Sequence, residues 1–300
     1  MDVHHLYESL QAGTQGETIE LYRISNSSKA IQTDTPWFAP LFDAHAHLHT
    51  AVDRLGHRVV TDRRNVPPEA SIAVVDTWHE PHRFPSTDPA AGYEYPYLRV
   101  YTAFGCHPRE AHRWNERTSR RIVRCLDRFQ SAIAVGECGY DDARSAPDLQ
   151  AQHTAFTAQA ALAAEMSLPL VIHCRADGRD HTRWYQALRQ NITDAGLSQS
   201  NLYWHSCTAS SQTIRLFHRM FPNMYFGVSN KTLLCDRRRT QAASNSVPLE
   251  RLLVESDAPH LLESPWDITN VIDALAEARG TPANLIRDCT INNAHRFYRV

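Results

Sequence analysis

Eight short apolar runs recur along the chain from residue 41 onward, and most of them are continuously apolar rather than alternating. Parallel strands that are buried on both faces have this pattern. The runs are LFDAH (41–45), SIAVVD (71–76), LRVYTAFG (98–105), AIAVGE (132–137), LPLVIH (168–173), NLYWHS (201–206), MYFGVS (224–229) and RLLVES (251–256). Eight strands that alternate with helices predict an α/β fold of the (β/α)8 kind, the TIM barrel.

Helical periodicity in the intervening segments supports this prediction. It is clearest in three segments. RTSRRIVRCLDRF (117–129) places its apolar side chains on one stripe, and SSQTIRLFHRMF (210–221) carries Ile214, Phe217 and Phe221 at helical spacing. DLQAQHTAFTAQAALAAEM (148–166) is rich in Ala and Gln, with Phe156 near its centre. The segment TWHEPHRFPSTDPAAGYEYP, residues 77–96, instead predicts a loop between the second and third strands. Residues 1–37 are polar with one strand-like stretch, TIELYRI (18–24), and we interpret them as a short N-terminal extension to a barrel domain over 38–300.

Composition limits the class of protein. A length of 300 residues suits a single barrel, and a hydrophobic fraction of 42% can fill its core. The formal net charge is −2, so the chain lacks the overall positive charge that would indicate a nucleic-acid-binding protein. Its basic residues are nearly all arginine, a side chain that suits phosphate binding. Seven cysteines without a C-x-x-C pair indicate reduced thiols, and no apolar run is long enough for a membrane span. We expect an intracellular protein without membrane contact, cytoplasmic or nuclear.

Metal-binding side chains stand at, or directly after, the ends of five of the eight runs. Imidazole and carboxylate groups are common ligands of divalent ions. The carboxyl ends of barrel strands meet at one face, where active sites lie. A shared metal centre would satisfy these buried polar groups together, whereas a short H-x-H pattern by itself also suits a half-exposed edge strand. The predicted ligands are His45, His47, Glu137, His173, His205 and Asp257.

Six ligands exceed the need of one tetrahedral ion, so we predict two divalent ions, Mg²⁺, Mn²⁺ or Zn²⁺, with Glu137 as the bridging carboxylate. A bridging lysine is excluded at the fourth strand because the chain's only lysines are Lys29 and Lys231. Asp257 is predicted to bind metal and to accept a proton from the attacking water. Asp43 is expected to orient a neighbouring side chain.

Several longer motifs resemble the TatD family of metal-dependent deoxyribonucleases and related hydrolases over residues 41–299. They are FDAHAHLH, AFGCHPREA, AVGECGYDD, LPLVIHCR, WHSCTAS, FGVSNKT, LLVESDAPHLL and NNAHRFY. FGCHP and FPNM are especially similar to the animal TatD-domain-containing branch. The resemblance implies a TIM barrel with a two-metal centre that hydrolyses phosphodiester bonds in DNA or RNA, often as a 3′-5′ exonuclease. It also implies the same six ligands.

Three departures from the family pattern fall beside the predicted ligands. HCFSG is replaced by HSCTA (205–209), GLDY by GYDD (139–142) and DAPY by DAPH (257–260). The ligands are retained, and the shape of the substrate pocket is expected to differ. The predicted substrate contacts are His107, Arg175, Arg237, Arg238 and Arg239, with Lys231, Arg109 and Arg179 on the same rim. His49 and His260 are rim candidates, whereas His79 is grouped with structural or solvent-exposed histidines.

Three functions remain open from the sequence. The first is a metal-dependent phosphodiesterase, a nuclease with nucleic acid as its partner. The second is a hydrolase of a small phosphate ester or amide, and the third is a catalytically weak nucleic-acid-binding relative, suggested by the altered HSCTA segment. Retention of all six ligands favours an enzyme over the third. The sequence leaves the oligomeric state open, and a monomer is compatible with it.

Overall fold

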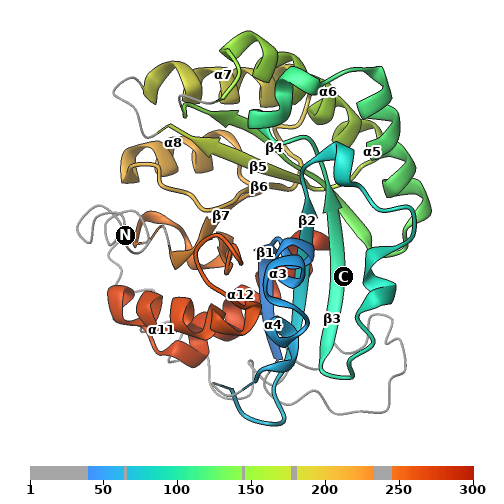
Figure 1. The fold of residues 1–300 in the computed structure, drawn as a ribbon. Coiled ribbons are helices and arrows are strands. Elements are labelled where there is room, and N and C mark those ends of the chain that lie inside the picture. Colours follow the sequence, from blue (N-terminus) through green and yellow to red (C-terminus); the bar gives the residue numbers. More distant parts are fainter. Residues whose placement is uncertain (1–39, 64–65, 144–145, 177–180, 231, 233–244) are drawn as a thin grey trace. The chain divides into compact units, whose positions relative to one another are not determined.

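Eight parallel strands form one sheet in the order of the sequence, as the apolar runs predicted. The computed structural model describes residues 40–63, 66–143, 146–176, 181–230, 232 and 245–300 (Figure 1). Each strand pairs in parallel with the next one, from β1 to β8. The strands are β1 (Pro40–Ala46), β2 (Ser71–Trp78), β3 (Leu98–Phe104), β4 (Ala132–Asp141), β5 (Leu170–Arg175), β6 (Leu202–Trp204), β7 (Met224–Val228) and β8 (Leu252–Val254). The TIM-barrel prediction is confirmed.

The first and last strands meet just beyond the end of β8. The backbone N–H of Asp257 donates to the carbonyl of His45 at 3.0 Å, and the N–H of His47 donates to the carbonyl of Ala258 at 2.7 Å. These two bonds nearly close the barrel. They also fix the relative positions of two strand ends that carry predicted ligands.

Helices follow most of the strands and lie on the outside of the sheet (Figure 1). The three segments with the clearest helical period are helices within one residue of the predicted ends, and polar side chains cap their first turns: Asn115 for α5, Asp148 for α6 and Ser210 for α8. The helices are α3 (Leu48–Leu55), α4 (Arg58–Thr61), α5 (Glu116–Arg128), α6 (Leu149–Glu165), α7 (His181–Asp194), α8 (Ser211–Met220), α11 (Ile268–Arg279) and α12 (Ala283–Tyr298).

The connection between β2 and β3 contains no α-helix, as predicted, although the predicted loop began two residues too early. Thr77 and Trp78 extend β2, because Trp78 still pairs with Phe104 of β3. Two short 3-10 helices follow, η1 (Pro81–Arg83) and η2 (Pro89–Gly92). The others are η3 (Pro108–Arg113), η4 (Leu249–Arg251) and η5 (Pro265–Asp267).

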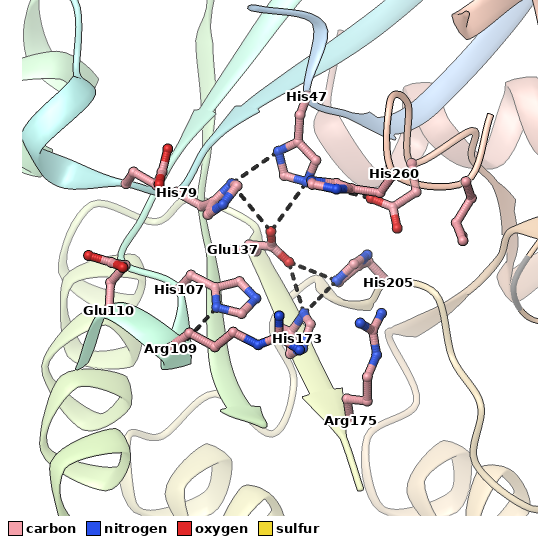
Figure 2. Close-up of a pocket in the computed structure, with 13 residues that line it drawn as sticks. His47, His79, His107, Arg109, Glu110, Glu137, His173, Arg175, His205 and His260 are labelled. Carbon is pink, nitrogen blue, oxygen red and sulfur yellow. Dashed lines mark hydrogen bonds and ion pairs between the residues drawn. The ribbon is translucent and has the colours of Figure 1, made fainter. Parts of the chain in front are cut away.

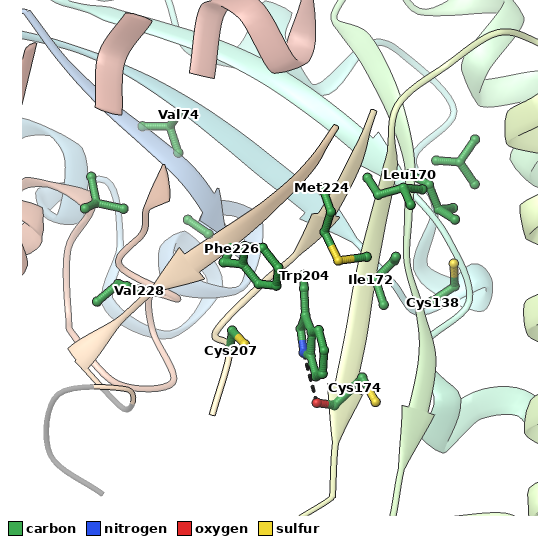
Figure 3. Close-up of a cluster of buried hydrophobic side chains, with 14 of the residues drawn as sticks. Val74, Cys138, Leu170, Ile172, Cys174, Trp204, Cys207, Met224, Phe226 and Val228 are labelled. Atoms are coloured by element: carbon green, nitrogen blue, oxygen red, sulfur yellow. Dashed lines mark hydrogen bonds between the residues drawn. The ribbon is translucent and has the colours of Figure 1, made fainter. Parts of the chain in front are cut away.

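Two apolar clusters stabilise the barrel. The smaller one fills its interior with Phe42, Val75, Val171 and neighbouring inward-facing side chains, and α12 adds Phe297 and Tyr298. The larger one packs the outer face of the sheet against the helices, and part of it surrounds the fully buried indole of Trp204 (Figure 3). The indole N–H donates to the carbonyl of Cys174 at 3.1 Å, so its polar atom is satisfied. Burial of one such large side chain stabilises the fold by roughly 3 kcal/mol.

The predicted N-terminal extension, residues 1–37, lies outside the described residues together with its strand-like stretch at 18–24. The division of the chain at residue 37 therefore stays a prediction. Among the described helices, none combines the length and apolar character that a membrane crossing requires. The cysteines in the described part of the chain are free thiols, and most of them are buried.

Candidate metal centre

A cavity of about 550 Å³ opens at the carboxyl ends of the strands (Figure 2). Five of the six predicted ligands line it, and the sixth, His45, is fully buried beside them. The lining residues are His47, His79, Glu80, His107, Arg109, Glu110, Glu137, His173, Arg175, His205, Asp257, His260 and Leu261. The six side chains that the sequence marked at five separate strand ends therefore lie together.

The Glu137 carboxylate lies at the middle of this group, and its two oxygens face different histidines. Oε1 is 3.5 Å from Nε2 of His47 and 3.9 Å from Nε2 of His45. Oε2 is 2.7 Å from Nε2 of His205 and 3.1 Å from Nδ1 of His173. A carboxylate with one oxygen toward each of two donor groups has the arrangement that a bridging ligand needs. The altered HSCTA segment leaves His205 in direct contact with it.

The strand-1 histidines and Asp257 form the donor group on the Oε1 side. The Asp257 carboxylate is 3.5 Å from Nε2 of His47 and 4.0 Å from Nε2 of His45. Nδ1 of His47 donates to the carbonyl of Thr77 at 2.8 Å, which places the proton of a neutral ring on Nδ1. Nε2 of His47 then has a free lone pair directed at the centre, as metal-binding histidines require.

The protonation of the centre without metal follows from its burial and its opposite charges. Burial by itself lowers the pKa of His205, but the Glu137 charge and hydrogen bond outweigh it and raise the pKa to about 10. Burial likewise opposes protonation of His47, but Asp257 and Glu137 raise its pKa to about 8. Burial raises the pKa of the Asp257 carboxyl, but the hydrogen bond from His47 and the charges of His205, His47 and His45 hold it below its usual range.

The donor set fits divalent metal ions. Nε2 of His45 faces Glu137 and Asp257 and is buried without a hydrogen-bond partner. An orphaned nitrogen of this kind costs free energy unless another group satisfies it. Ligand atoms of His45, His47 and Asp257 lie within 4.8 Å of one another, and those of His45, Glu137 and His205 do so as well. Nitrogen and carboxylate oxygen donors suit Zn²⁺ and Mn²⁺, and carboxylates suit Mg²⁺.

Two buried carboxylates support the ligand-bearing strands from behind. Asp43 accepts hydrogen bonds from the backbone N–H of His45 at 3.3 Å and of Ser256 at 2.9 Å, so it links the ends of β1 and β8. Glu255 lies 3.5 Å from Nδ1 of His205, on the opposite side of that ring from Glu137. Asp43 thus lies where the sequence predicted an orienting residue.

Sequence reasoning missed His79. Its Nδ1 is 3.0 Å from Nδ1 of His47 and 3.6 Å from Oε1 of Glu137, so the grouping with structural or exposed histidines was wrong. The predicted strand ends at Asp76, whereas β2 continues to Trp78 and His79 directly follows it. With the correct strand end, His79 occupies the same kind of position as the predicted ligands.

Asp141 is a second residue for which no role was predicted. It ends β4, is buried, and places its Oδ2 3.3 Å from Nε2 of His173 and 2.9 Å from Nε of Arg109. The predicted β4 run ended at Glu137, and the strand continues four residues further. The signal that could have found Asp141 is its place in the GYDD segment (139–142), which begins two residues after Glu137.

The two histidines predicted at the rim of the pocket lie in different places. His260 lines the cavity, and its ring centroid is 4.9 Å from that of His47. His49 does not line the cavity, because α3 begins at Leu48 and ends the extended alternation. Its Nδ1 lies 2.8 Å from the Asp76 carboxylate and its ring stacks on Trp78, so its placement on the rim was wrong.

The predicted substrate contacts are only partly described. His107, Arg109 and Arg175 line the cavity, as expected. Nδ1 of His107 accepts the backbone N–H of Arg109 at 3.0 Å. Arg237, Arg238 and Arg239 lie outside the described residues, as do Lys231 and Arg179, and their predicted contacts stay predictions.

Solved structures share the fold. A TatD homologue from Escherichia coli matches with a TM-score of 0.67 at 23% identity, covering 87% of this chain and 98% of its own. A TatD family hydrolase from Entamoeba histolytica matches with a TM-score of 0.70 at 16% identity, covering 87% of this chain and 99% of its own.

Sequence relatives extend the comparison. Proteins named 3′-5′ ssDNA/RNA exonuclease TatD are 32% identical to this chain in Edwardsiella piscicida and in Enterobacter lignolyticus. The first match spans 211 residues, 65% of this chain and 76% of the relative, and the second spans 219 residues, 68% and 80%. These relatives are bacterial and give no support to the predicted animal branch. A family profile described as TatD related DNase matches residues 42–299, and the chain therefore belongs to the TatD family.

Proposed function

We propose that this protein is a divalent-metal-dependent nuclease that removes nucleotides from the 3′ end of single-stranded DNA or RNA. Membership of the TatD family and the names of its bacterial relatives support this activity. The observation that carries it is the position of Glu137, with one carboxylate oxygen toward each of two groups of buried histidines. This arrangement favours two metal ions with Glu137 as their shared ligand.

Each side of the centre would have its own ligands in this proposal. His45, His47 and Asp257 would hold metal on the Oε1 side of Glu137, and His173 and His205 would hold it on the Oε2 side. Divalent ions at such a site polarise a phosphoryl oxygen and lower the pKa of water. Asp257 remains ionised at neutral pH because its pKa is depressed, so it is able to accept the proton of the attacking water.

Two further residues are proposed to hold the scissile phosphate. Burial and the neighbouring His173 keep the pKa of His107 well below its ordinary value, so its ring is neutral. Since Nδ1 accepts from Arg109, the proton lies on Nε2, which can donate to a phosphate oxygen. Arg175 lines the cavity and, within the described residues, forms no ion pair, so its guanidinium remains available to a phosphate.

An intracellular site of action belongs to the proposal, because free buried thiols suit a reducing compartment. The bacterial relatives give no support to the nuclear alternative. Nucleic acid is the proposed partner.

The test is degradation of a 5′-labelled and a 3′-labelled single strand of DNA and of RNA, with Mg²⁺, Mn²⁺ or Zn²⁺ and with a chelator. We expect metal-dependent shortening from the 3′ end. Asp257→Asn keeps the shape of the side chain but removes its charge, and it should lower turnover by at least about 10²-fold. Hydrolysis of a small phosphodiester without degradation of either polymer would contradict the proposal and favour a small-ester hydrolase.

A further inference from the structure

Helix α5 carries an unusual concentration of positive charge. Five of its 13 residues are arginine, against 31 lysine and arginine residues in the 300 of the whole chain. Arg117, Arg121, Arg124 and Arg128 are spaced by four, three and four residues, so they form one stripe along the helix. The stripe is roughly 16 Å long at 1.5 Å per residue. The buried side of the same helix packs on β3 and β4.

The stripe borders a groove of about 530 Å³ between α5 and the segment that follows η1. All five arginines of the helix line it, together with Phe84, Pro85, Ser86, Cys125 and Phe129, and no carboxylate is among the lining residues. Arg121 is held in the groove by Phe84. Its guanidinium donates a hydrogen bond to the Phe84 carbonyl at 3.3 Å and lies 6.0 Å from the centroid of the Phe84 ring. The groove is therefore a concave and uniformly cationic surface.

Most of this charge is not neutralised by the protein. Arg120 pairs with Glu116 at 3.4 Å, and both side chains are mostly exposed, which makes the pair weak. Within the described residues, Arg117, Arg124 and Arg128 form no ion pair. Like charges at positions i and i+3 or i+4 destabilise a helix by about 0.2–0.5 kcal/mol per pair. The stripe thus costs the helix stability, and an anion that lay along it would offset that cost.

The stripe lies on the helix that follows a cavity-lining segment in the chain. Arg109 and Glu110 line that cavity and belong to η3, which leads directly into α5. Arg113 pairs with Glu110 at 3.1 Å and precedes Arg117 by four residues. The cationic surface therefore starts next to the cavity wall and continues along the outside of the barrel.

We propose that this arginine groove, made by Arg117, Arg120, Arg121, Arg124 and Arg128, binds the sugar-phosphate backbone of the nucleic-acid chain whose end occupies the catalytic cavity. The inference rests on the proposed nuclease function and adds a second binding surface to it. Guanidinium groups bind phosphate oxygens bidentately, and a linear row of them suits a ligand with regularly spaced phosphates. A membrane surface fits less well, because the exposed large hydrophobic residues of the described part, Leu216 and Val300, are not on α5.

The test compares two triple variants that remove the same charge. R117Q/R124Q/R128Q changes the three unpaired arginines and leaves the Arg121 contact intact. R215Q/R219Q/R296Q changes three exposed arginines on α8 and α12 as a matched control. Binding of a labelled 20-nucleotide single strand is measured by fluorescence anisotropy over a range of salt concentrations, with chelator present to prevent degradation. A trinucleotide serves as the short ligand, because it cannot occupy the cavity and the length of the groove at once.

We expect the stripe variant to bind the 20-mer about tenfold more weakly at low salt, with a salt slope smaller by about two units, since each lost single-strand contact removes about 0.7. Its affinity for the trinucleotide should equal that of the wild type. The control variant should keep the wild-type slope, and R117K/R124K/R128K should restore it because the charge returns.

Three outcomes would overturn the inference. They are equal weakening by both triple variants, no weakening by the stripe variant, or a stripe-dependent loss of binding to vesicles with 30% phosphatidylserine while binding to the 20-mer is unchanged. The wild-type protein is assayed in parallel for metal-dependent degradation of the same 20-mer. If the wild type degrades the strand and one of these three outcomes is observed, the proposed role of the groove is rejected and the proposed nuclease function is retained. If the wild type neither binds nor degrades the strand, the proposed nuclease function is itself rejected.

Discussion

Substitution of Glu137 by glutamine removes one negative charge from the middle of the centre while it keeps the shape of the side chain. Five histidine nitrogens lie between 2.7 and 3.9 Å from the two oxygens of this carboxylate. At about 3.5 Å and an effective dielectric constant of about 20, a unit charge pair interacts by roughly 5 kcal/mol. Desolvation of the carboxylate offsets part of this. If about half remains, metal affinity and turnover should each fall by roughly 50-fold.

The measurement is metal content by mass spectrometry after equilibration at a fixed free-ion concentration, with hydrolysis of a labelled single strand in parallel. Glu110→Gln is the matched control, because Glu110 lines the same cavity but pairs with Arg113 at 3.1 Å rather than with the buried histidines. A partly exposed pair at the cavity edge contributes little to the metal centre, so the control should lose less than about fivefold. A Glu137→Gln protein that retains full metal content and turnover within that range would refute the bridging role.

Two further predictions test the electrostatics and the packing of the site. Without metal, His47 and His205 are protonated at pH 7, because their pKa values are raised to about 8 and about 10. Metal binding must displace these protons, so the apparent metal affinity should rise as the pH is raised from 6 to 9, and roughly one to two protons should be released. Calorimetry in buffers of different ionisation enthalpy measures this release. A binding heat that does not depend on the buffer would contradict the prediction. Gly105→Ala would place a Cβ 2.6 Å from the Gly136 backbone beside Glu137, so it should destabilise the fold by about 1–3 kcal/mol in urea unfolding. Gly92→Ala, where a Cβ meets nothing within 4 Å, should stay within about 0.5 kcal/mol, and equal stability of the two variants would show that the contact at Gly105 is absent.

The sequence by itself determined the barrel and the identity of the side chains at its active face. Buried parallel strands need continuous apolar runs, and this requirement is local, so it can be read without knowing which strands pair. The convergence of the strand ends follows from the topology of any such barrel. His45, His47, Glu137, His173 and His205 could therefore be grouped before any contact was known.

Contacts between strands were decided only by the tertiary structure. Because Trp78 pairs with Phe104, β2 extends to the residue before His79. Helix α3 begins at Leu48, so the His49 side chain points toward Asp76 rather than into the cavity. Neither strand length nor helix start is fixed by local periodicity, because neighbouring strands supply the hydrogen bonds that extend or end an element.

The division of Glu137's two oxygens between two groups of histidines, and the arginine groove beside α5, also depend on segments far apart in the sequence. Arginine spacing places a stripe on the helix, but only the packing of α5 beside Phe84 makes that stripe one wall of a groove. Local sequence sets which groups are available, whereas distances of a few ångströms between them arise from the folded barrel, whose packing brings together residues that no local pattern relates.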